Sequence, residues 1–286
     1  IKEGPYKDKM IKIDKRWANI EYWKALGQMV DPITFGYYLN AVDLKYDSNK
    51  NIVQQPKKRR IYNSTWLLTL EVSVLVTLFC LMLGYPIAYL LASLPLKYSN
   101  LLMICVLLPF WTSLLVRTVS WIVILMQKGV FNSVLVWAGI IADENRMQLI
   151  YNKTGTIIAM TQILLPFMVL PLYSVMKTIS PNYMRAALNL GAKPMNAFYK
   201  IYMPQTVPGI SAGGLLVFVL AIGYFITPEL VGGSQGLLIG HFIAYHLKTT
   251  LNWGLCSALG TILLTAMLLL YWVYNKIVGI ENIKLG

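Results

Sequence analysis

Beyond residue 60 the chain alternates between long apolar runs and short polar stretches. An α-helix needs about 20 mostly apolar residues to cross the hydrocarbon core of a bilayer. Five runs reach that length, and we expect each to be a transmembrane helix: Trp66–Leu94, Leu101–Met126, Gly155–Met176, Thr206–Thr227 and Leu255–Tyr274. The pattern therefore predicts an all-α, polytopic membrane protein.

Prolines and glycines mark where these helices bend or come close together. Pro86 allows a kink in the first run, Pro109 and Arg117 interrupt the second, and Pro166 and Pro171 lie inside the third. The fourth run carries glycines that permit close helix packing in a membrane: Gly209, Gly213, Gly214 and Gly223.

The remaining segments are expected to lie outside the hydrocarbon core. Residues 130–142 and 236–247 are apolar but too short to span, and we predict interfacial helices there. Residues 1–60 are polar and charged, which separates an extramembrane segment, 1–60, from a membrane domain, 61–280. Within the first segment we expect short amphipathic helices broken at Pro32 and Gly36, followed by an extended surface loop at residues 45–60.

The stretch 180–205 is too polar to cross a membrane, and its residues predict two short helices joined by a tight corner. Ser180 suits the N-cap and Pro181 the first helical position. One face would then carry Tyr183, Ala186, Ala187 and Leu190, with Gly191 as a left-handed stop. Pro194 can open the second helix, which we expect to end before Pro204. The two alanines leave a smooth patch that another protein surface could approach.

This stretch resembles the cytoplasmic loop of ABC-importer permeases, whose pattern is Glu-Ala-Ala, three residues, Gly, and later Ile-x-Leu-Pro. The matching positions are Ala186, Ala187, Gly191, Ile201 and Pro204, while Arg185 replaces the Glu and Met203 the Leu. The resemblance extends from about Trp66 to Tyr274. The segments LMLGYPIAYLLASLP, LLPFWTSLLVRT, LLPFMVLPLYSVM and GGSQGLLIG are similar to the first permease subunit of spermidine/putrescine-type importers.

The resemblance implies a type I ABC-importer permease fold in a bacterial inner membrane, with a sixth helix upstream of Ile1. It implies that residues 1–60 are periplasmic and that the loop at 180–205 couples to an ATPase in the cytoplasm. The coupling residues carried over are Arg185, Ala186, Ala187, Gly191 and Pro204. The implied partners are a second permease subunit, a cytoplasmic ATP-binding dimer, a periplasmic substrate-binding protein and membrane lipid.

The positive-inside rule supports this orientation in part. The cytoplasmic loops would hold Lys97, Lys177, Arg185, Lys193, Lys200, Lys276 and Lys284, against Lys128, Arg146, Lys153 and Lys248 in the short external loops. The basic run Lys57–Arg60 opposes it, because those four cations would lie outside, just before a span. The rule is weak for long translocated loops, so we keep the orientation that the resemblance implies.

Composition narrows the function classes. Of 286 residues, 57% are apolar and only 13% are charged, which is too apolar for an ordinary soluble domain. The net charge is +13, and 13 of the 25 Lys and Arg residues lie within the first 60 positions, but no basic, aromatic-rich domain points to nucleic acid. The chain has no P-loop, no H-E-x-x-H, no G-x-S-x-G and no cysteine cluster, so the sequence predicts neither an enzyme nor a cofactor or metal site. His241 and His246 are expected to make polar contacts.

Four residues are candidates for a transport path. Arg117 is costly in lipid and should face protein or water, either as a structural partner or lining the path. Trp111 and Tyr224 could pack or could stack on a substrate ammonium group. Glu229 closes the fourth run, where it could pair at the membrane surface or contact a cationic solute.

We expect a permease subunit that forms half of the path of an ATP-driven importer, with polyamines as the solute. Related permeases carry other small solutes, including phosphonates, opines and metal complexes, and this alternative stays open. A stand-alone secondary transporter would need intramembrane carboxylates and an inverted repeat, and neither is evident. A membrane-embedded enzyme would need clustered His, Asp or Cys residues near a span end.

Overall fold

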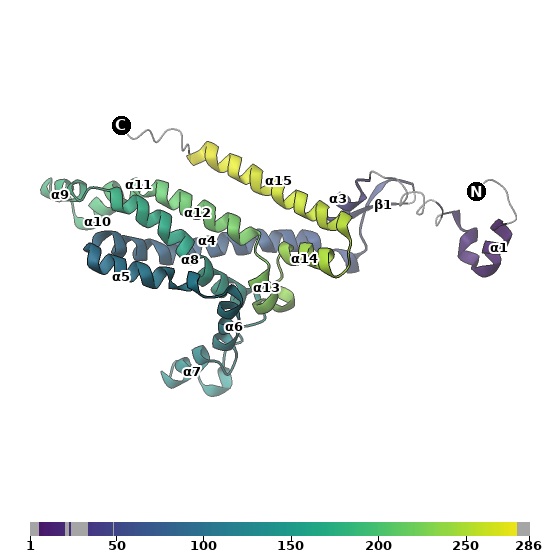
Figure 1. Ribbon diagram of the computed structural model, residues 1–286, viewed down its shortest axis with the longest axis horizontal. Helices are drawn as coiled ribbons and strands as arrows, with labels where there is room; N and C mark the ends of the chain where they lie inside the picture. Colours follow the sequence, from purple (N-terminus) through teal and green to yellow (C-terminus); the bar gives the residue numbers. More distant parts are fainter. Residues whose placement is uncertain (1–5, 21–22, 24–33, 48, 279–286) are drawn as a thin grey trace.

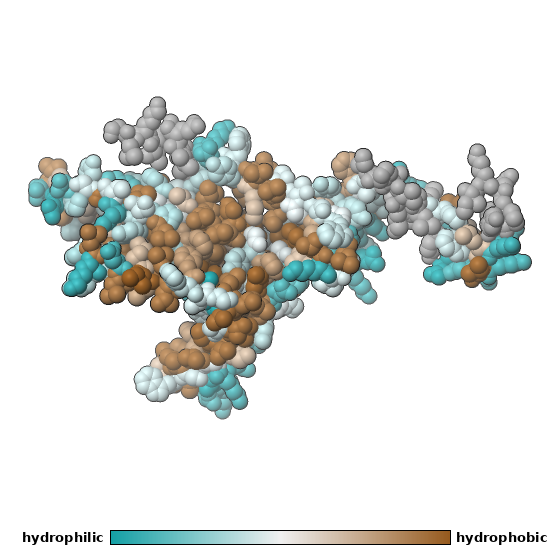
Figure 2. Space-filling view, in the orientation of Figure 1, coloured by the Kyte–Doolittle hydropathy of each residue, from teal (hydrophilic) through white to brown (hydrophobic). Residues whose placement is uncertain are grey.

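The computed structural model describes residues 6–20, 23, 34–47 and 49–278. The chain is almost entirely helical, with one two-stranded sheet near its N-terminal end. Within this part, four helices are long and apolar enough to cross a membrane, or five if a pair bent by 60° is one span. Figure 2 shows apolar side chains gathered over the middle of the bundle, with hydrophilic ones at both ends.

The core is formed by three helices: α4 (Tyr62–Ser93), α8 (Lys153–Thr178) and α12 (Val207–Ile222). Met168 of α8 lies between two glycines. A Cβ on Gly84 of α4 would be 3.0 Å from Met168 Cγ, and one on Gly213 of α12 would be 2.9 Å from its Sδ. The glycines therefore let the three backbones approach closely, as expected for helices packed in a membrane.

The remaining helices surround this core (Figure 1). Alongside it run α5 (Leu96–Leu107) with the 3-10 turn η3 (Leu108–Trp111), and α15 (Trp253–Val278). Shorter helices at the margins are α6 (Leu114–Leu125), α7 (Val130–Trp137), α13 (Ile226–Val231) and α14 (Ile239–Lys248). Single 3-10 turns are η4 (Asp143–Asn145) and η6 (Gly233–Gln235).

The second expected span, Leu101–Met126, is broken into two helices, and the break lies just after Pro109, one of the two residues expected to interrupt it. The helix stops at η3, Thr112 and Ser113 are extended, and α6 then turns away from the bundle with α7 at its tip (Figure 1). Pro109 removes one main-chain donor from the end of the first piece, which favours a break there. By length and composition the span-like stretch is Leu114–Trp137, which contains α6 and α7.

The fourth span is also interrupted. We expected it to run to Thr227, but α12 ends at Ile222 and α13 begins at Ile226. In the loop before it, helical turns continue through Pro204 instead of ending ahead of it. After α9 (Asn182–Asn189) and α10 (Pro194–Ala197), the chain forms a π-helical turn, η5 (Phe198–Tyr202), and then α11 (Met203–Gln205). The wider π turn accommodates a proline that cannot donate to the ordinary helical acceptor.

The N-terminal segment contains α1 (Tyr6–Ile13), η1 (Lys15–Ala18), α3 (Gly36–Asn40), the strands β1 (Leu44–Tyr46) and β2 (Ile52–Gln54), and η2 (Lys57–Arg59). The expected extended loop at 45–60 is thus partly an antiparallel hairpin, with Lys45 opposite Val53. Gly36 begins a helix and does not break one. The predicted break at Pro32 lies outside the described residues.

Asp43 holds this segment onto the beginning of α4. Its side chain is buried and accepts hydrogen bonds from the backbone N–H groups of Ile61, Tyr62 and Asn63 at 2.8–3.1 Å. The helix's own N-cap residue, Ile61, supplies no such bond. A helix begins with N–H groups that have no partner within the helix, so a buried carboxylate from a remote segment stabilises this end.

A second contact ties α4 to α14. The Tyr62 hydroxyl lies 2.7 Å from His246 Nε2, and His246 Nδ1 lies 2.9 Å from Thr250 Oγ1. Burial lowers the pKa of His246 below its ordinary value, which favours the neutral ring. A neutral ring can accept at Nε2 from Tyr62 while it donates from Nδ1 to Thr250.

The hairpin stands well beyond the end of α8. Lys153, the first residue of α8, forms an ion pair with Glu71, which places Glu71 level with that end. Glu71 is nine residues into α4, or about 14 Å along a helix that rises about 1.5 Å per residue. The basic run Lys57–Arg60 lies at this outer end, immediately before Tyr62, which is buried in an apolar cluster with Ile239 and Leu255 of α14 and α15.

The glycine contacts give a first prediction. Gly213→Ala should place a Cβ 3.1 Å from the Met168 carbonyl oxygen, whereas Gly214→Ala meets nothing within 4 Å. Both substitutions replace Gly by Ala and gain the same helix propensity, so the difference in their free energies of unfolding reports the packing of the new methyl group. We expect Gly213→Ala to be less stable than Gly214→Ala by about 1–3 kcal/mol, measured by unfolding of the purified protein in detergent. Equal stability would show that α8 and α12 are not in close contact.

Candidate functional site

The loop at 180–205 forms one end of the molecule, opposite the hairpin (Figure 1). Gly191 follows α9 with φ +85°, the left-handed conformation that the sequence predicted for the corner. Ser180 is displaced by one position from the expected cap, because α9 begins at Asn182, whose N–H lies 3.3 Å from Ser180 Oγ. The corner is therefore built as expected, with a small shift at its start.

The loop presents an exposed surface around the corner. Ala187 is buried against the loop, whereas Arg185, Ala186 and Pro204 are exposed. Tyr183 and Leu190 are exposed as well, with Leu190 88% accessible. Among the described residues, Ala187 is the member of the predicted face that is buried, and the other three side chains are exposed.

Two of the four path candidates come together where α6 meets α13. Arg117 is close enough to Tyr224 to act electrostatically on its phenol, and a hydrogen bond of 3.2 Å joins Thr118 to Thr227. Arg117 is partly buried, yet its Nε and Nη1 atoms have no hydrogen-bond partner among the described residues. Leaving buried donors unsatisfied is costly, which marks this guanidinium as a position whose hydrogen bonds the described residues do not complete.

The other two candidates lie apart from this pair. Glu229 of α13 is 3.7 Å from His241 of α14, and its side chain is 47% exposed. Trp111 is 89% exposed at the end of η3. The sequence thus identified residues that form one neighbouring pair, Arg117 with Tyr224, and two separate positions.

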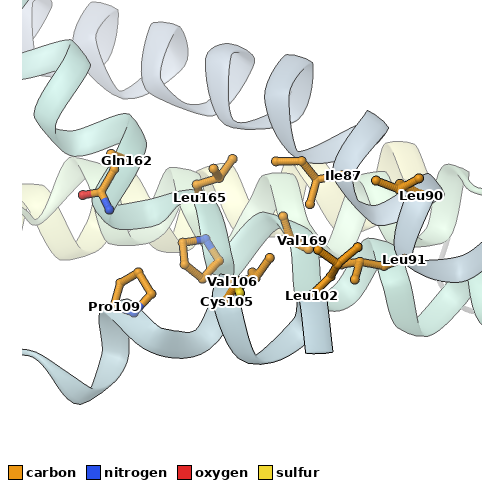
Figure 3. Close-up of a pocket in the computed structure, with 11 residues that line it drawn as sticks. Ile87, Leu90, Leu91, Leu102, Cys105, Val106, Pro109, Gln162, Leu165 and Val169 are labelled. Atoms are coloured by element: carbon orange, nitrogen blue, oxygen red, sulfur yellow. The ribbon is translucent and has the colours of Figure 1, made fainter. Parts of the chain in front are cut away.

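An apolar cavity of about 400 Å³ lies between α4, α5 and α8 (Figure 3). Figure 3 shows Gln162 and Pro109 at one end, with Val106, Leu165 and Val169 along it. Gln162 is the polar residue of the lining, and its Oε1 accepts a hydrogen bond of 2.9 Å from Trp121 Nε1 of α6. This bond joins α6 to the bundle, and sequence inspection did not single out either residue.

A second apolar hollow, of about 550 Å³, lies between α4, α12 and α15. The buried hydroxyl of Tyr274 borders it without a hydrogen-bond partner among the described residues. None of the four path candidates lines either of these two hollows. In the described residues, these hollows therefore do not enclose the candidate path.

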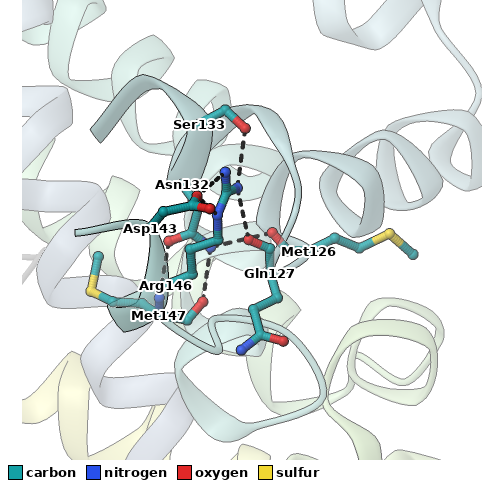
Figure 4. Close-up of polar contacts among 7 residues, drawn as sticks. All are labelled: Met126, Gln127, Asn132, Ser133, Asp143, Arg146 and Met147. Carbon is teal, nitrogen blue, oxygen red and sulfur yellow. Dashed lines mark hydrogen bonds and ion pairs between the residues drawn. The ribbon is translucent and has the colours of Figure 1, made fainter. Parts of the chain in front are cut away.

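Beyond α6, a polar network fixes the chain around α7 (Figure 4). The guanidinium of Arg146 donates to Asp143 Oδ1 at 2.7 Å and reaches the Gln127 carbonyl and Ser133 Oγ at 3.3 Å. Asn132 bonds both ways with the backbone of Met147 at 2.8 and 3.0 Å. A loop that looks irregular in sequence is thus held in one shape beside an apolar helix.

Chemically, these sites offer transient polar and aromatic contacts. Among the described residues, no group of three or more His, Cys, Asp or Glu side chains could hold a metal ion. His246 makes the expected polar contacts, with Tyr62 and Thr250, whereas His241 Nδ1 lies 3.7 Å from Glu229 Oε1, too far for a hydrogen bond.

Comparison with known proteins identifies the family. Residues 84–279 match the family model of the binding-protein-dependent transport system inner membrane component. The spermidine/putrescine transport system permease protein PotB of Escherichia coli K12 is 38% identical over 228 residues, covering 77% of this chain and 82% of that protein. The PotB protein of Haemophilus influenzae is 36% identical over 214 residues, covering 74% of each chain.

A solved structure shares the fold. The crystal structure of a bacterial ABC transporter involved in the import of the acidic polysaccharide alginate aligns with a TM-score of 0.66 over 98% of this chain and 95% of that one, at 18% identity. The fold is accordingly the all-α type I importer permease fold, as the sequence predicted. The chain belongs to the family of binding-protein-dependent transport system inner membrane components and is a multi-pass protein of the bacterial inner membrane.

Proposed function

We propose that this chain is a permease subunit of an ATP-driven polyamine importer and forms half of its translocation path. The observation that carries the solute class is the 36–38% identity to the PotB permeases over about three quarters of the chain. The permease performs no covalent chemistry. It converts conformational change at the loop into alternating access of the path.

Three protein partners follow from this role. A second permease subunit completes the path, and a periplasmic binding protein delivers the solute on the side of residues 1–60. A dimeric ATP-binding subunit contacts the loop at 180–205 through Arg185, Ala186, Ala187 and Gly191, with Pro204 at the return to the membrane. Arg185 is exposed where the family pattern has Glu, so its counterpart on the ATPase should be acidic. Membrane lipid surrounds the remaining apolar surface.

A different small solute in the same role is the second candidate. Arg117 carries buried donors without a partner among the described residues, and it lies near Tyr224. An anion would suit a path that Arg117 faces, whereas a polyamine would suit Glu229 and the aromatic side chains. The two candidates therefore differ in which of these residues contacts the solute.

Glu229→Gln separates them. The substitution keeps size and hydrogen bonding but removes the charge, so it should lower spermidine uptake several-fold without lowering membrane abundance. Glu144→Gln is the control, because it removes an exposed carboxylate at η4. Uptake of spermidine is measured in cells, and ATP hydrolysis by the purified complex is measured with spermidine or an anionic solute. Stimulation by the anionic solute alone would overturn the polyamine assignment.

Gly191→Val tests the coupling role. A β-branched residue at φ +85° should cost about 1–2 kcal/mol of backbone strain, although no atom lies within 4 Å of the new Cβ. We expect normal membrane insertion with loss of ATPase binding or uptake. Gly191→Asn is the matched control, because Asn tolerates the left-handed conformation and should retain most activity. Normal uptake by the valine variant would argue against this corner as the coupling element.

Cysteine labelling tests the orientation. Asn51, in the hairpin, and Asn196, in α10, lie at opposite ends of the molecule, and both are exposed. A cysteine at position 51 should react with a membrane-impermeant maleimide added to spheroplasts, and one at position 196 should react only after lysis. Cys105 is exposed and should first be replaced by alanine. The reverse labelling would place the loop outside and would agree with the basic run Lys57–Arg60.

A further inference from the structure

The bend between the loop and α12 is not fixed by a continuous helical ladder. The two helical pieces meet at 60° around Thr206. Pro204 and Pro208 lie on either side, and neither has an N–H group. Consequently Pro208 cannot donate to the Pro204 carbonyl, the ordinary acceptor four residues before it. The preceding turn, Phe198–Tyr202, is already the wider π form, which is frequent at functional sites.

A side-chain bond from α4 reaches the bend instead. Thr206 is fully buried, and its hydroxyl donates to the Met203 carbonyl at 2.7 Å. Because the single hydroxyl proton is used there, the Tyr85 hydroxyl is the donor in the 3.2 Å contact with Thr206 Oγ1. Two consecutive hydrogen bonds, from Tyr85 to Thr206 and from Thr206 to Met203, therefore connect α4 to the backbone on the loop side of the bend.

Aromatic rings extend the same contact. The aromatic cluster consists of Tyr85 and Tyr89 of α4 with Phe198 and Tyr202 of the π turn. Phe198 meets the rings of both α4 tyrosines edge to face, at 6.2 and 5.6 Å, and Tyr202 meets Tyr89 at 5.3 Å. Phe198 and Tyr202 stack at 5.6 Å. Four rigid rings packed in this way resist sliding of the loop along α4.

The contact also falls at a weak point of α4. Pro86 lies inside this helix and follows Tyr85 directly, so the Met82 carbonyl loses its ordinary donor. A displacement of Tyr85 therefore moves α4 at the point where its series of main-chain hydrogen bonds is interrupted.

We propose that Tyr85 is a positioning residue for coupling: its bond to Thr206, with the aromatic cluster, makes the loop and the end of α4 one moving body. The backbone then bends only at Thr206. When the loop moves, the end of α4 moves with it, because the contact between them does not deform. This inference rests on the proposed coupling through the loop and adds the element that transmits it.

The transport test compares two tyrosines one turn apart. Tyr85→Phe removes the hydroxyl that bonds Thr206 and keeps the ring. Tyr89→Phe removes a hydroxyl from the same cluster and leaves that bond intact. In proteoliposomes containing the whole complex and the binding protein, we expect Tyr85→Phe to reduce spermidine transported per ATP hydrolysed several-fold. ATP hydrolysis should stay within about twofold of the unmodified complex, and Tyr89→Phe should change neither quantity.

Variants of Thr206 provide a rescue test. Thr206→Val should reproduce the Tyr85→Phe ratio, and the double variant should be no worse than either single one, because both remove one bond. Thr206→Ser keeps the hydroxyl and should preserve the ratio. A purely structural role predicts instead that abundance, ATP hydrolysis and transport fall together while the ratio is unchanged, and this result would overturn the proposal.

Distance measurements separate this inference from the coupling proposal. Spin labels can be placed at exposed positions on the loop, α4 and α12, namely Met195, Leu90 and Leu216, after Cys105 and Cys256 are replaced by alanine. On ATP binding, the 195–90 distance should stay constant while the 195–216 distance shifts, and Tyr85→Phe should broaden the 195–90 distribution. If neither distance responds to ATP, the coupling proposal fails and this inference with it. If the loop moves but Tyr85→Phe behaves like Tyr89→Phe, this inference alone fails.

Discussion

The close approach of three helix backbones around Met168 is the contact on which the rest of the structure depends. In lipid, apolar side chains gain little by leaving the solvent for a protein interior, so helices associate through tight van der Waals contact. Gly84 and Gly213 permit that contact on both sides of α8, and Gly209 extends it along the Pro171 carbonyl. The apolar part of α8 is 61% buried, far more than that of α15 at 22%. The outer helices are thus attached to a three-helix core and do not form it.

Hydropathy located the helices of this core but could not place the breaks between helices. An apolar run has the same mean hydropathy whether its backbone continues as one helix or turns. Hydropathy averaged over about 20 residues therefore does not reveal the breaks at Thr112–Ser113 and Gly223–Phe225. Gly191 was predictable because the left-handed corner favours glycine, a local rule. The hairpin and the Asp43 contact with the first turn of α4 were not predictable, since each depends on segments that meet only after folding.

The same distinction applies to the functional residues. Arg117 and Glu229 could be selected from sequence because charge within an apolar run is conspicuous. Lys153 entered the sequence analysis only as a cation of an external loop, and its pairing with Glu71 required knowing that both lie at the same depth. Tyr85 and Thr206 are separated by 121 positions and neither is charged, so no local pattern could have connected them. The candidate path residues could therefore be selected from sequence, whereas the proposed connection between Tyr85 and the loop could not.

The charges near the candidate path restrict how the proposed second permease subunit would complete it. A polyamine carries several positive charges, and a guanidinium with unsatisfied donors beside its route would repel it unless a carboxylate neutralised that cation. Among the described residues Arg117 has no such carboxylate, and Glu229 contacts His241. If the cargo is a polyamine, the partner permease must supply the acidic group opposite α6, and the heterodimer interface then sets the charge of the path. If the cargo is anionic, Arg117 needs no such partner. The charge of the solute therefore determines whether the subunit interface needs an acidic group near Arg117.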